Sequence, residues 1–189
     1  HIVGTPMRGD VIRGKKLPYR IMCDKIKSLM CGLGAYETTT YSFIPSKAID
    51  TLLLDENDNR RNQIKIINPL GDEYSTMRTQ LITSMLTVLS TNINRKIEDG
   101  RFYEISKRFI ADELPVKEQP HELPTMSIGI YGKNEDFFTL KGIIEELMKL
   151  SGAHTQYERS NEPYLHPGRQ ALVKANNVVA AVFGEVHPT

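Results

Sequence analysis

Histidine and cysteine are the side chains with the widest chemistry, and this 189-residue chain has five histidines and two cysteines. No two histidines stand at the spacing of metal ligands and no Cys-x-x-Cys occurs, so the sequence predicts no metal site. His166 and His187 each precede a proline, which restricts the backbone beside them. They could present two imidazoles at the ends of one hairpin. The interpretation we favour is that they hydrogen-bond loop backbone and hold the turns.

Both cysteines, Cys23 and Cys31, fall in one predicted helix. Their spacing corresponds to roughly 12 Å along the helix axis, which exceeds the limit of about 7 Å between the Cα atoms of a disulfide. We therefore expect two reduced thiols, in keeping with the cytosol. No histidine lies near them in the sequence, which argues against a catalytic thiol.

The chain also lacks the glycine motifs that cradle phosphates and the Gly-x-Ser-x-Gly turn of hydrolases, so we predict no catalytic residue in it. Arg78 and Arg169 are candidates for ion pairs, with Glu104 and Glu185 as their expected partners. We interpret Arg169 as a buried structural guanidinium rather than a substrate clamp. Such a pair needs good geometry to offset its desolvation.

Composition excludes some broad classes of function. Lys and Arg total 24 against 23 Asp and Glu, so there is no general attraction to nucleic acid or to a membrane surface. No run of 18 or more apolar residues occurs, and the sequence therefore predicts no membrane span. The chain begins with His1 rather than Met, so we expect it to be a fragment of a longer protein.

The N-terminal part divides into an arm and a helix. Residues 1–16 are rich in glycine and basic residues and are expected to form an extended linker that leads into a core domain of residues 17–189. Pro18 suits the first turn of a helix, and Gly32 and Gly34 end it. Apolar residues recur along this helix at helical spacing, either buried against the domain's own sheet, which is the default, or forming a face between subunits. These residues are Met22, Ile26, Leu29 and Met30.

Periodicity and turn signals divide the middle of the chain into short strands and helices. Pro69 cannot donate to a strand ladder, so the chain must turn there. We expect strands over residues 36–44, 63–67 and 101–109, helices over 46–53 and 80–96, a turn at 68–71 and a loop over 112–124.

A third helix follows a half-buried strand at residues 126–131. Thr139 can cap this helix, and Glu145 can pair with Lys149 four residues on. Gly152 is expected to end it.

The chain finishes with strands near residues 154–158, 170–175 and 178–183. Asn tolerates positive φ, so Asn176 and Asn177 predict a tight hairpin turn between the last two strands. Gly168 is expected to have the positive φ of a turn glycine. Hairpin signals without tight βαβ repeats predict an α+β fold, with a largely antiparallel sheet that carries helices on one face.

Five motifs in order carry a family resemblance. They are residues 68–70 with 73–79, residues 92–95 with 102–105, residues 136–142, the Leu-His-Pro-Gly-Arg of 165–169 and the Gly-Glu-Val-His-Pro of 184–188. Over most of residues 17–188 the chain resembles the phenylalanyl-tRNA synthetase beta subunit family. The resemblance implies a structural signature at Asn68, Pro69, Arg78, Glu104, Lys141, Gly142, His166, Gly168, Arg169, Glu185 and His187.

The resemblance implies an antiparallel sheet flanked by helices, like the catalytic domain of class II aminoacyl-tRNA synthetases. Residues 16–45 resemble the first class II motif, which builds subunit interfaces in that family. The family also implies a partner, the alpha subunit, which carries the active site for ATP, phenylalanine and the tRNA end. The whole enzyme is expected to be a cytoplasmic heterotetramer of two alpha and two beta chains that uses ATP and magnesium and binds tRNA. No cofactor is expected in this segment.

Two departures from a catalytic class II domain decide the predicted role. Such a domain has an arginine two residues before a strand glutamate, whereas Arg101 stands three residues before Glu104 and should face the other side of the strand. The glycine-rich third motif is also not evident. We therefore predict a non-catalytic core domain that scaffolds the alpha subunit. The alternatives are a tRNA-binding module and a standalone adenylate-forming ligase.

Overall fold

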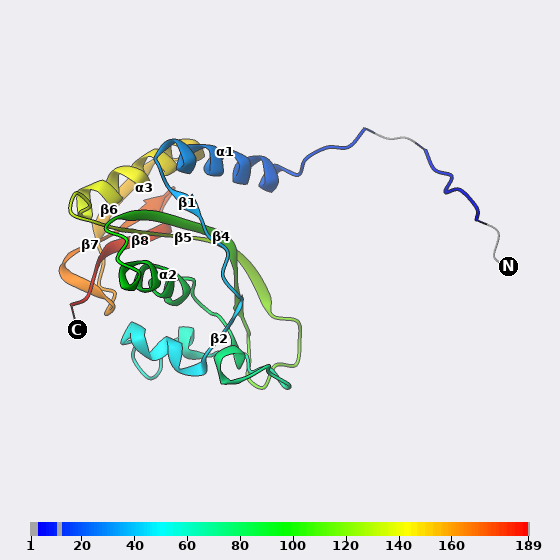
Figure 1. The fold of residues 1–189 in the computed structure, drawn as a ribbon, viewed down its shortest axis with the longest axis horizontal. Helices are drawn as coiled ribbons and strands as arrows, with labels where there is room; N and C mark the ends of the chain where they lie inside the picture. Colours follow the sequence, from blue (N-terminus) through cyan, green and yellow to red (C-terminus); the bar gives the residue numbers. More distant parts are fainter. Residues whose placement is uncertain (1–3, 11–12, 189) are drawn as a thin grey trace.

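The computed structural model describes residues 4–10 and 13–188. The described residues of the predicted linker, 4–10 and 13–16, contain no helix or strand and extend away from the body as an arm (Figure 1). The rest of that linker prediction, residues 1–3 and 11–12, lies outside the described residues. The arm is tied to the first helix where Lys16 Nζ donates to a carboxylate oxygen of Asp24 at 2.6 Å. In the part of the chain that is described, no helix is long and apolar enough to cross a membrane.

The first helix, α1, spans Pro18–Gly32, with proline in its first turn as the sequence predicts. Gly34 follows with a φ of 74°, a left-handed conformation that glycine adopts without steric cost. Cys23 is buried in this helix and Cys31 is exposed, and both thiols are free.

The strand predicted over residues 36–44 is wrong as a continuous element. It is two short strands, β1 at Tyr36–Glu37 and β2 at Phe43–Ile44. Between them the backbone N–H of Thr40 donates to the Glu104 side chain, so the ladder with the neighbouring strand breaks there. β2 pairs instead with β3, Thr76–Met77, in antiparallel fashion.

The strand predicted over residues 63–67 is also wrong. Only an isolated bridge joins Lys65 to Thr76, with backbone hydrogen bonds from Ile66 to Ser75 and from Met77 to Ile64 on either side. Three short 3-10 helices complete this region: η1 at Ser46–Leu52, where a helix was predicted, η2 at Asn59–Arg61 and η3 at Asp72–Tyr74.

The main sheet has the strand order β1-β4-β5. β4 spans Gly100–Ile110 and pairs in antiparallel register with β5, His121–Tyr131, while β1 runs parallel to β4. The loop predicted over 112–124 is therefore too long, because Pro124 already lies within β5 opposite Lys107. A proline is tolerated there because β5 is an edge strand, so its missing N–H need not break a ladder.

Helices cover both faces of this sheet, not one face as predicted. Tyr103 of β4 packs in one core with Met30 of α1 and Ile143 of α3, which spans Phe137–Ser151. On the other face lies α2, Ile82–Asn94, whose Met85 side chain would stand 2.8 Å from a Cβ built on Gly129. Figure 1 shows α1 and α3 on one side of β4 and β5, and α2 on the other.

Two details of α3 differ from what the sequence predicted. Its N-cap is Asp136, whose carboxylate accepts from the backbone N–H of Thr139 at 2.7 Å, so Thr139 is not the cap itself. Glu145 pairs with Lys141, one turn earlier, rather than with Lys149. Gly152 ends the helix in the left-handed conformation, as predicted.

A second sheet, of order β6-β7-β8, packs against α3. Its strands, all antiparallel, are β6 at Thr155–Arg159, β7 at Leu165–Ala175 and β8 at Val178–Val186. Asn176 and Asn177 have φ values of 49° and 67° and form the predicted tight turn. Gly168 lies within β7 without a positive φ, so the expectation of a turn glycine there is wrong.

Candidate functional site

The centre of the domain is occupied by an ion pair between two fully buried side chains. Arg78 directly follows β3, and Glu104 lies in the middle of β4. Arg78 Nη2 stands 3.0 Å from Glu104 Oε1, and the two side chains are 0% and 2% exposed. The structure therefore joins the two residues that the sequence analysis paired.

The remaining polar atoms of this pair also have protein partners. Arg78 donates through Nη1 to Thr40 Oγ1 at 2.7 Å, through Nη2 to Ser106 Oγ at 2.6 Å and through Nε to the Lys107 carbonyl at 3.1 Å. Thr40 Oγ1 in turn donates to Glu104 Oε2 at 2.7 Å. A buried ion pair offsets its desolvation only when such additional bonds are made. The network therefore links the residue after β3 to β4, and its two charged side chains are already paired with each other.

Arg101 is directed away from this network. Its Nε donates to Glu135 Oε1 and its Nη1 to the Leu33 carbonyl, both at 2.8 Å. The residue two positions before Glu104 is Phe102, whose ring stacks on Tyr131 with centroids 6.4 Å apart. Phe102 thus occupies the sequence position at which the resemblance led us to expect an arginine in a catalytic domain.

The C-terminal hairpin holds five of the signature residues, at the end away from its turn. His166 Nδ1 accepts the backbone N–H of Gly168 at 3.0 Å, which is the backbone-holding role that we favoured. The backbone N–H of His187 donates to the Tyr164 carbonyl at 2.9 Å. Arg169 Nη1 stands 3.1 Å from Glu185 Oε2, so the predicted pair exists. Its predicted burial is wrong, because more than half of the Arg169 side chain is exposed.

The other signature residues lie apart from the network and the hairpin. Asn68 and Pro69 are exposed in the turn before η3. Lys141 on α3 pairs with Glu145 and lies over the Tyr157 ring, 4.9 Å from its centroid. The hydrogen bond to Glu145 raises the pKa of Lys141. Gly142 is half-buried on the same helix, with open space where a Cβ would stand.

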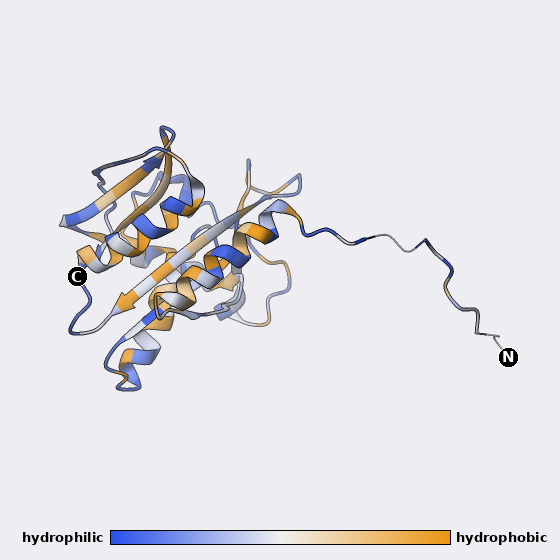
Figure 2. Cartoon of the chain, turned by 90° about the horizontal axis from the view of Figure 1, so that it is seen from above, coloured by the Kyte–Doolittle hydropathy of each residue, from blue (hydrophilic) through white to orange (hydrophobic). Residues whose placement is uncertain are grey.

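The apolar residues of α1 divide between core and surface. Met30 is fully buried against Ala35, Tyr103 and Ile143, so it cannot belong to a subunit interface. Ile26 also packs against this core, and Leu29 is half-buried. Met22 is exposed, and sequence reasoning missed that three further apolar residues are exposed at the same end. They are Leu17, Tyr19 and Ile21, and Figure 2 shows hydrophobic and hydrophilic residues alternating along α1 up to the end where the arm begins.

A cluster that sequence reasoning did not find connects the two halves of the domain. Arg60 Nη1 donates to Glu162 Oε2 and Nη2 donates to Asp58 Oδ2, both at 2.7 Å. The hydrogen bond from Arg60 holds the pKa of Asp58 below its usual value. Burial raises the pKa of the neighbouring Tyr164 to about 12. The residues stand about a hundred positions apart in sequence, and no motif links them.

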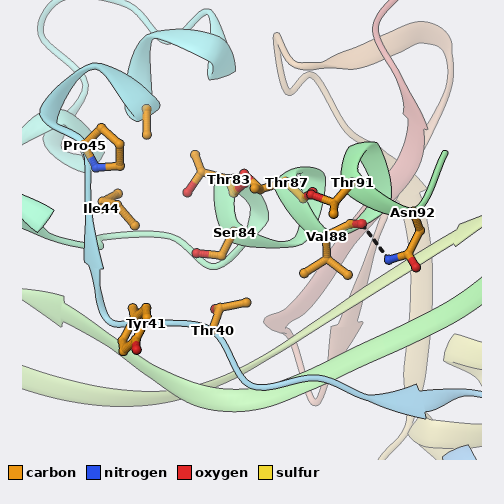
Figure 3. Close-up of a pocket in the computed structure, with 11 residues that line it drawn as sticks. Thr40, Tyr41, Ile44, Pro45, Thr83, Ser84, Thr87, Val88, Thr91 and Asn92 are labelled. Carbon is orange, nitrogen blue, oxygen red and sulfur yellow. Dashed lines mark hydrogen bonds between the residues drawn. The ribbon is translucent and has the colours of Figure 1, made fainter. Parts of the chain in front are cut away.

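A groove lies between α2 and the chain segment at residues 40–48. Its volume is about 320 Å³. One wall is the side of α2 that carries Thr83, Thr87 and Thr91, and the other wall includes Ile44 and Pro45 (Figure 3). Of the described residues, no group of three or more His, Cys, Asp or Glu side chains is arranged to hold a metal ion, in this groove or elsewhere.

Comparison with known proteins identifies the family. Residues 2–189 match the model of the phenylalanyl tRNA synthetase beta chain CLM domain. The chain belongs to this family. Relatives named phenylalanine--tRNA ligase beta subunit include that of Clostridium acetobutylicum, which is 36% identical over 99% of this chain. That of Clostridium tetani is 38% identical over 87% of it.

The chain spans only a quarter or less of those relatives, 24% of the first and 21% of the second. Among solved structures, PylSc of Desulfitobacterium hafniense, a pyrrolysyl tRNA synthetase, superposes with a TM-score of 0.64 over 87% of this chain and 55% of that one. The sequence identity is 12%, so this likeness shows the fold alone. It confirms the prediction of an α+β fold that resembles the class II synthetase catalytic domain.

Proposed function

We propose that this chain is the non-catalytic core domain of a phenylalanyl-tRNA synthetase beta chain, and that it scaffolds a catalytic alpha subunit. The observation that supports the proposal most is the central Arg78–Glu104 pair, which is buried and bonded on all sides. Phe102, not an arginine, stands two residues before Glu104. Among the described residues, the position two before Glu104 therefore offers no cation to hold the α-phosphate of ATP.

In this proposal the chemistry belongs to the partner. The alpha subunit would bind ATP, magnesium, phenylalanine and the tRNA end, in a cytoplasmic heterotetramer of two alpha and two beta chains. tRNA would meet the beta chain through the whole enzyme rather than through this domain alone. The near balance of 24 basic and 23 acidic residues supports that division, because a strong electrostatic attraction for RNA needs an excess of basic charge.

The surface that we propose for the subunit contact is the N-terminal end of α1, defined by Leu17, Tyr19, Ile21 and Met22. All four side chains are exposed although they are apolar. Clustered exposed apolar residues mark interaction sites more often than scattered ones do. Ile26 and Leu29 can contribute at the edge of this surface, since both retain some exposure.

The proposal is tested by mixing the chain with the alpha subunit and measuring association by sedimentation. We expect a complex at micromolar concentration that is weakened at least about tenfold when Ile21 and Met22 are both replaced by Glu, because two charges would be buried without partners. Val178→Glu is the matched control, because Val178 is also exposed and apolar but lies on β8. No weakening by the α1 variant, or equal weakening by both variants, would contradict a contact at this surface.

A second measurement separates this function from a standalone ligase. We expect no ATP–pyrophosphate exchange by the chain alone. Exchange that is lost in Arg101→Ala would instead assign the nucleotide to this chain and overturn the proposal.

A further inference from the structure

The groove between α2 and residues 40–48 has a chemical character that differs from the rest of the surface. None of the eleven residues that line it, all of them described, carries a charged side chain. Its walls consist of uncharged polar residues and apolar residues. They are Thr40, Tyr41, Ile44, Pro45, Ala48, Thr83, Ser84, Thr87, Val88, Thr91 and Asn92.

Most of the polar groups in these walls are already used. Thr87 Oγ1 donates to the Thr83 carbonyl at 3.0 Å, and Thr91 Oγ1 donates to the Thr87 carbonyl at 2.8 Å. Asn92 donates to the Val88 carbonyl at 2.9 Å, and the hydroxyl of Thr40 belongs to the Arg78–Glu104 network. Because their polar atoms are engaged elsewhere, these residues offer the groove mainly carbon. The wall along α2 is therefore more apolar than its sequence indicates.

One buried polar atom in the wall of the groove has no hydrogen-bond partner among the described residues. Thr83 is only 6% exposed, and its Oγ1 is buried without a hydrogen-bond partner among the described residues. Ser84, also buried, adds a second hydroxyl beside it. Figure 3 shows both hydroxyls directed from α2 toward the wall that carries Ile44. Buried polar groups are normally hydrogen-bonded, so an unmatched one in the wall of a groove points to a missing partner.

We propose that this groove binds a small uncharged molecule that has an apolar ring or branched alkyl body and a single hydroxyl or carbonyl oxygen. The body would pack against the methyl groups of Thr87 and Val88 and against Ile44 and Pro45. The oxygen would exchange a hydrogen bond with Thr83. A charged molecule such as an amino acid or a nucleotide does not fit, because burying an unpaired charge against this lining is costly. The volume of about 320 Å³ is within the range of small-molecule sites.

Cyclohexanol and cyclohexylammonium are matched probes, because they share a ring and differ in charge. Binding of each to the intact beta chain, purified with its alpha subunit, is measured by saturation-transfer NMR. We expect cyclohexanol to bind with a dissociation constant on the order of 1 mM and cyclohexylammonium not to bind at this site. Thr83→Val keeps the shape of the side chain and removes the hydroxyl, so it should weaken cyclohexanol roughly fivefold.

Two variants fill the groove from opposite walls, Ala48→Phe from η1 and Val88→Phe from α2. Each should abolish the cyclohexanol signal while the melting temperature and complex formation show that the protein is folded. Thr125→Val on β5 is the control, because it also replaces a threonine by valine but lies outside the groove. The proposal is overturned if cyclohexanol does not bind, if the ammonium binds equally well at this site, or if binding survives in a folded variant with a filled groove.

Discussion

Two of the Arg–Glu pairs in this domain look alike as contacts and differ in their surroundings. Arg78 and Glu104 stand 3.0 Å apart, and Arg169 and Glu185 stand 3.1 Å apart. The first pair is 0% and 2% exposed, and the second is 55% and 35% exposed. Contact distance alone therefore gives no measure of what each pair contributes to stability.

Access to water determines how much each pair contributes to stability. Around the exposed pair, water solvates both charges whether or not they touch, so forming the contact gains little. Around the buried pair, each charge depends on the other and on Thr40, Ser106 and the Lys107 carbonyl for its hydrogen bonds. Removing one member of the buried pair leaves the other as an uncompensated charge in the core. Replacing the arginine by the same residue should therefore cost much stability in the buried pair and little in the exposed pair.

Arg78→Met is expected to give the largest effect, a loss of about 3–5 kcal/mol in the free energy of unfolding, because Glu104 is left buried without its counterion. Urea unfolding of the chain followed by circular dichroism measures the change. A loss below about 1 kcal/mol would mean that water enters and solvates Glu104, and the contrast between the two pairs would then disappear.

A substitution at Gly184 tests whether the hairpin that carries the exposed pair is loosely packed along its whole length. A Cβ built on Gly184 would stand 2.6 Å from the Arg169 carbonyl oxygen and 2.9 Å from the Gln170 Cα, both backbone atoms that cannot move aside easily. Gly184→Ala is therefore expected to destabilise the chain by about 1–3 kcal/mol in urea unfolding.

Gly168→Ala is the matched control for Gly184. Its Cβ would meet only the His166 ring at ordinary contact distance, 3.5 Å, and its φ is not positive. We expect a change within about 0.5 kcal/mol. A larger cost at Gly168 than at Gly184 would contradict the packing described for this hairpin.

The sequence predicted the long elements because their signals are local. The helices that became α1, α2 and α3 follow from apolar spacing with glycine at the ends of α1 and α3, and the Asn176-Asn177 turn follows from tolerance of positive φ. The residue types likewise led to the expected pairing of Arg78 with Glu104, which the structure contains. What local patterns do not encode is which strand face a distant helix covers, so the position of α2 was missed.

The errors arose where a tertiary contact overrides a local preference. The Thr- and Tyr-rich stretch after Ala35 has the composition of a strand, but Thr40 bonds to a side chain in another strand and the ladder stops. Arg169 was expected to be buried because a structural guanidinium paired with a carboxylate was favoured over a substrate clamp. Exposure depends on what packs above a strand, and nothing in the residues around Arg169 shows that.

The cluster of Arg60 and Tyr164 adds a third case to the comparison, because its burial lies between that of the two ion pairs. The pKa of Tyr164 is raised from an ordinary value near 10 to about 12, chiefly by burial. Folding therefore favours the protonated phenol. Its contribution to stability is complete below pH 10 and is lost as pH rises from 10 to 12.

We accordingly expect wild-type chain to lose about 1 kcal/mol more than Tyr164→Phe between pH 9 and pH 11. Urea unfolding of both proteins at the two pH values gives this difference, and the titration of other groups cancels in it. Parallel losses in the two proteins would show that the phenol is solvated in the folded chain.

Arg169→Met should have the smallest effect, because the guanidinium and the Glu185 carboxylate both remain hydrated when they separate. We expect a loss of at most about 1 kcal/mol in urea unfolding. Since salt screens exposed charges, that loss should shrink further in about 1 M NaCl, whereas the loss from Arg78→Met should persist. A cost for Arg169→Met close to that of Arg78→Met, and insensitive to salt, would mean that burial does not separate the two pairs.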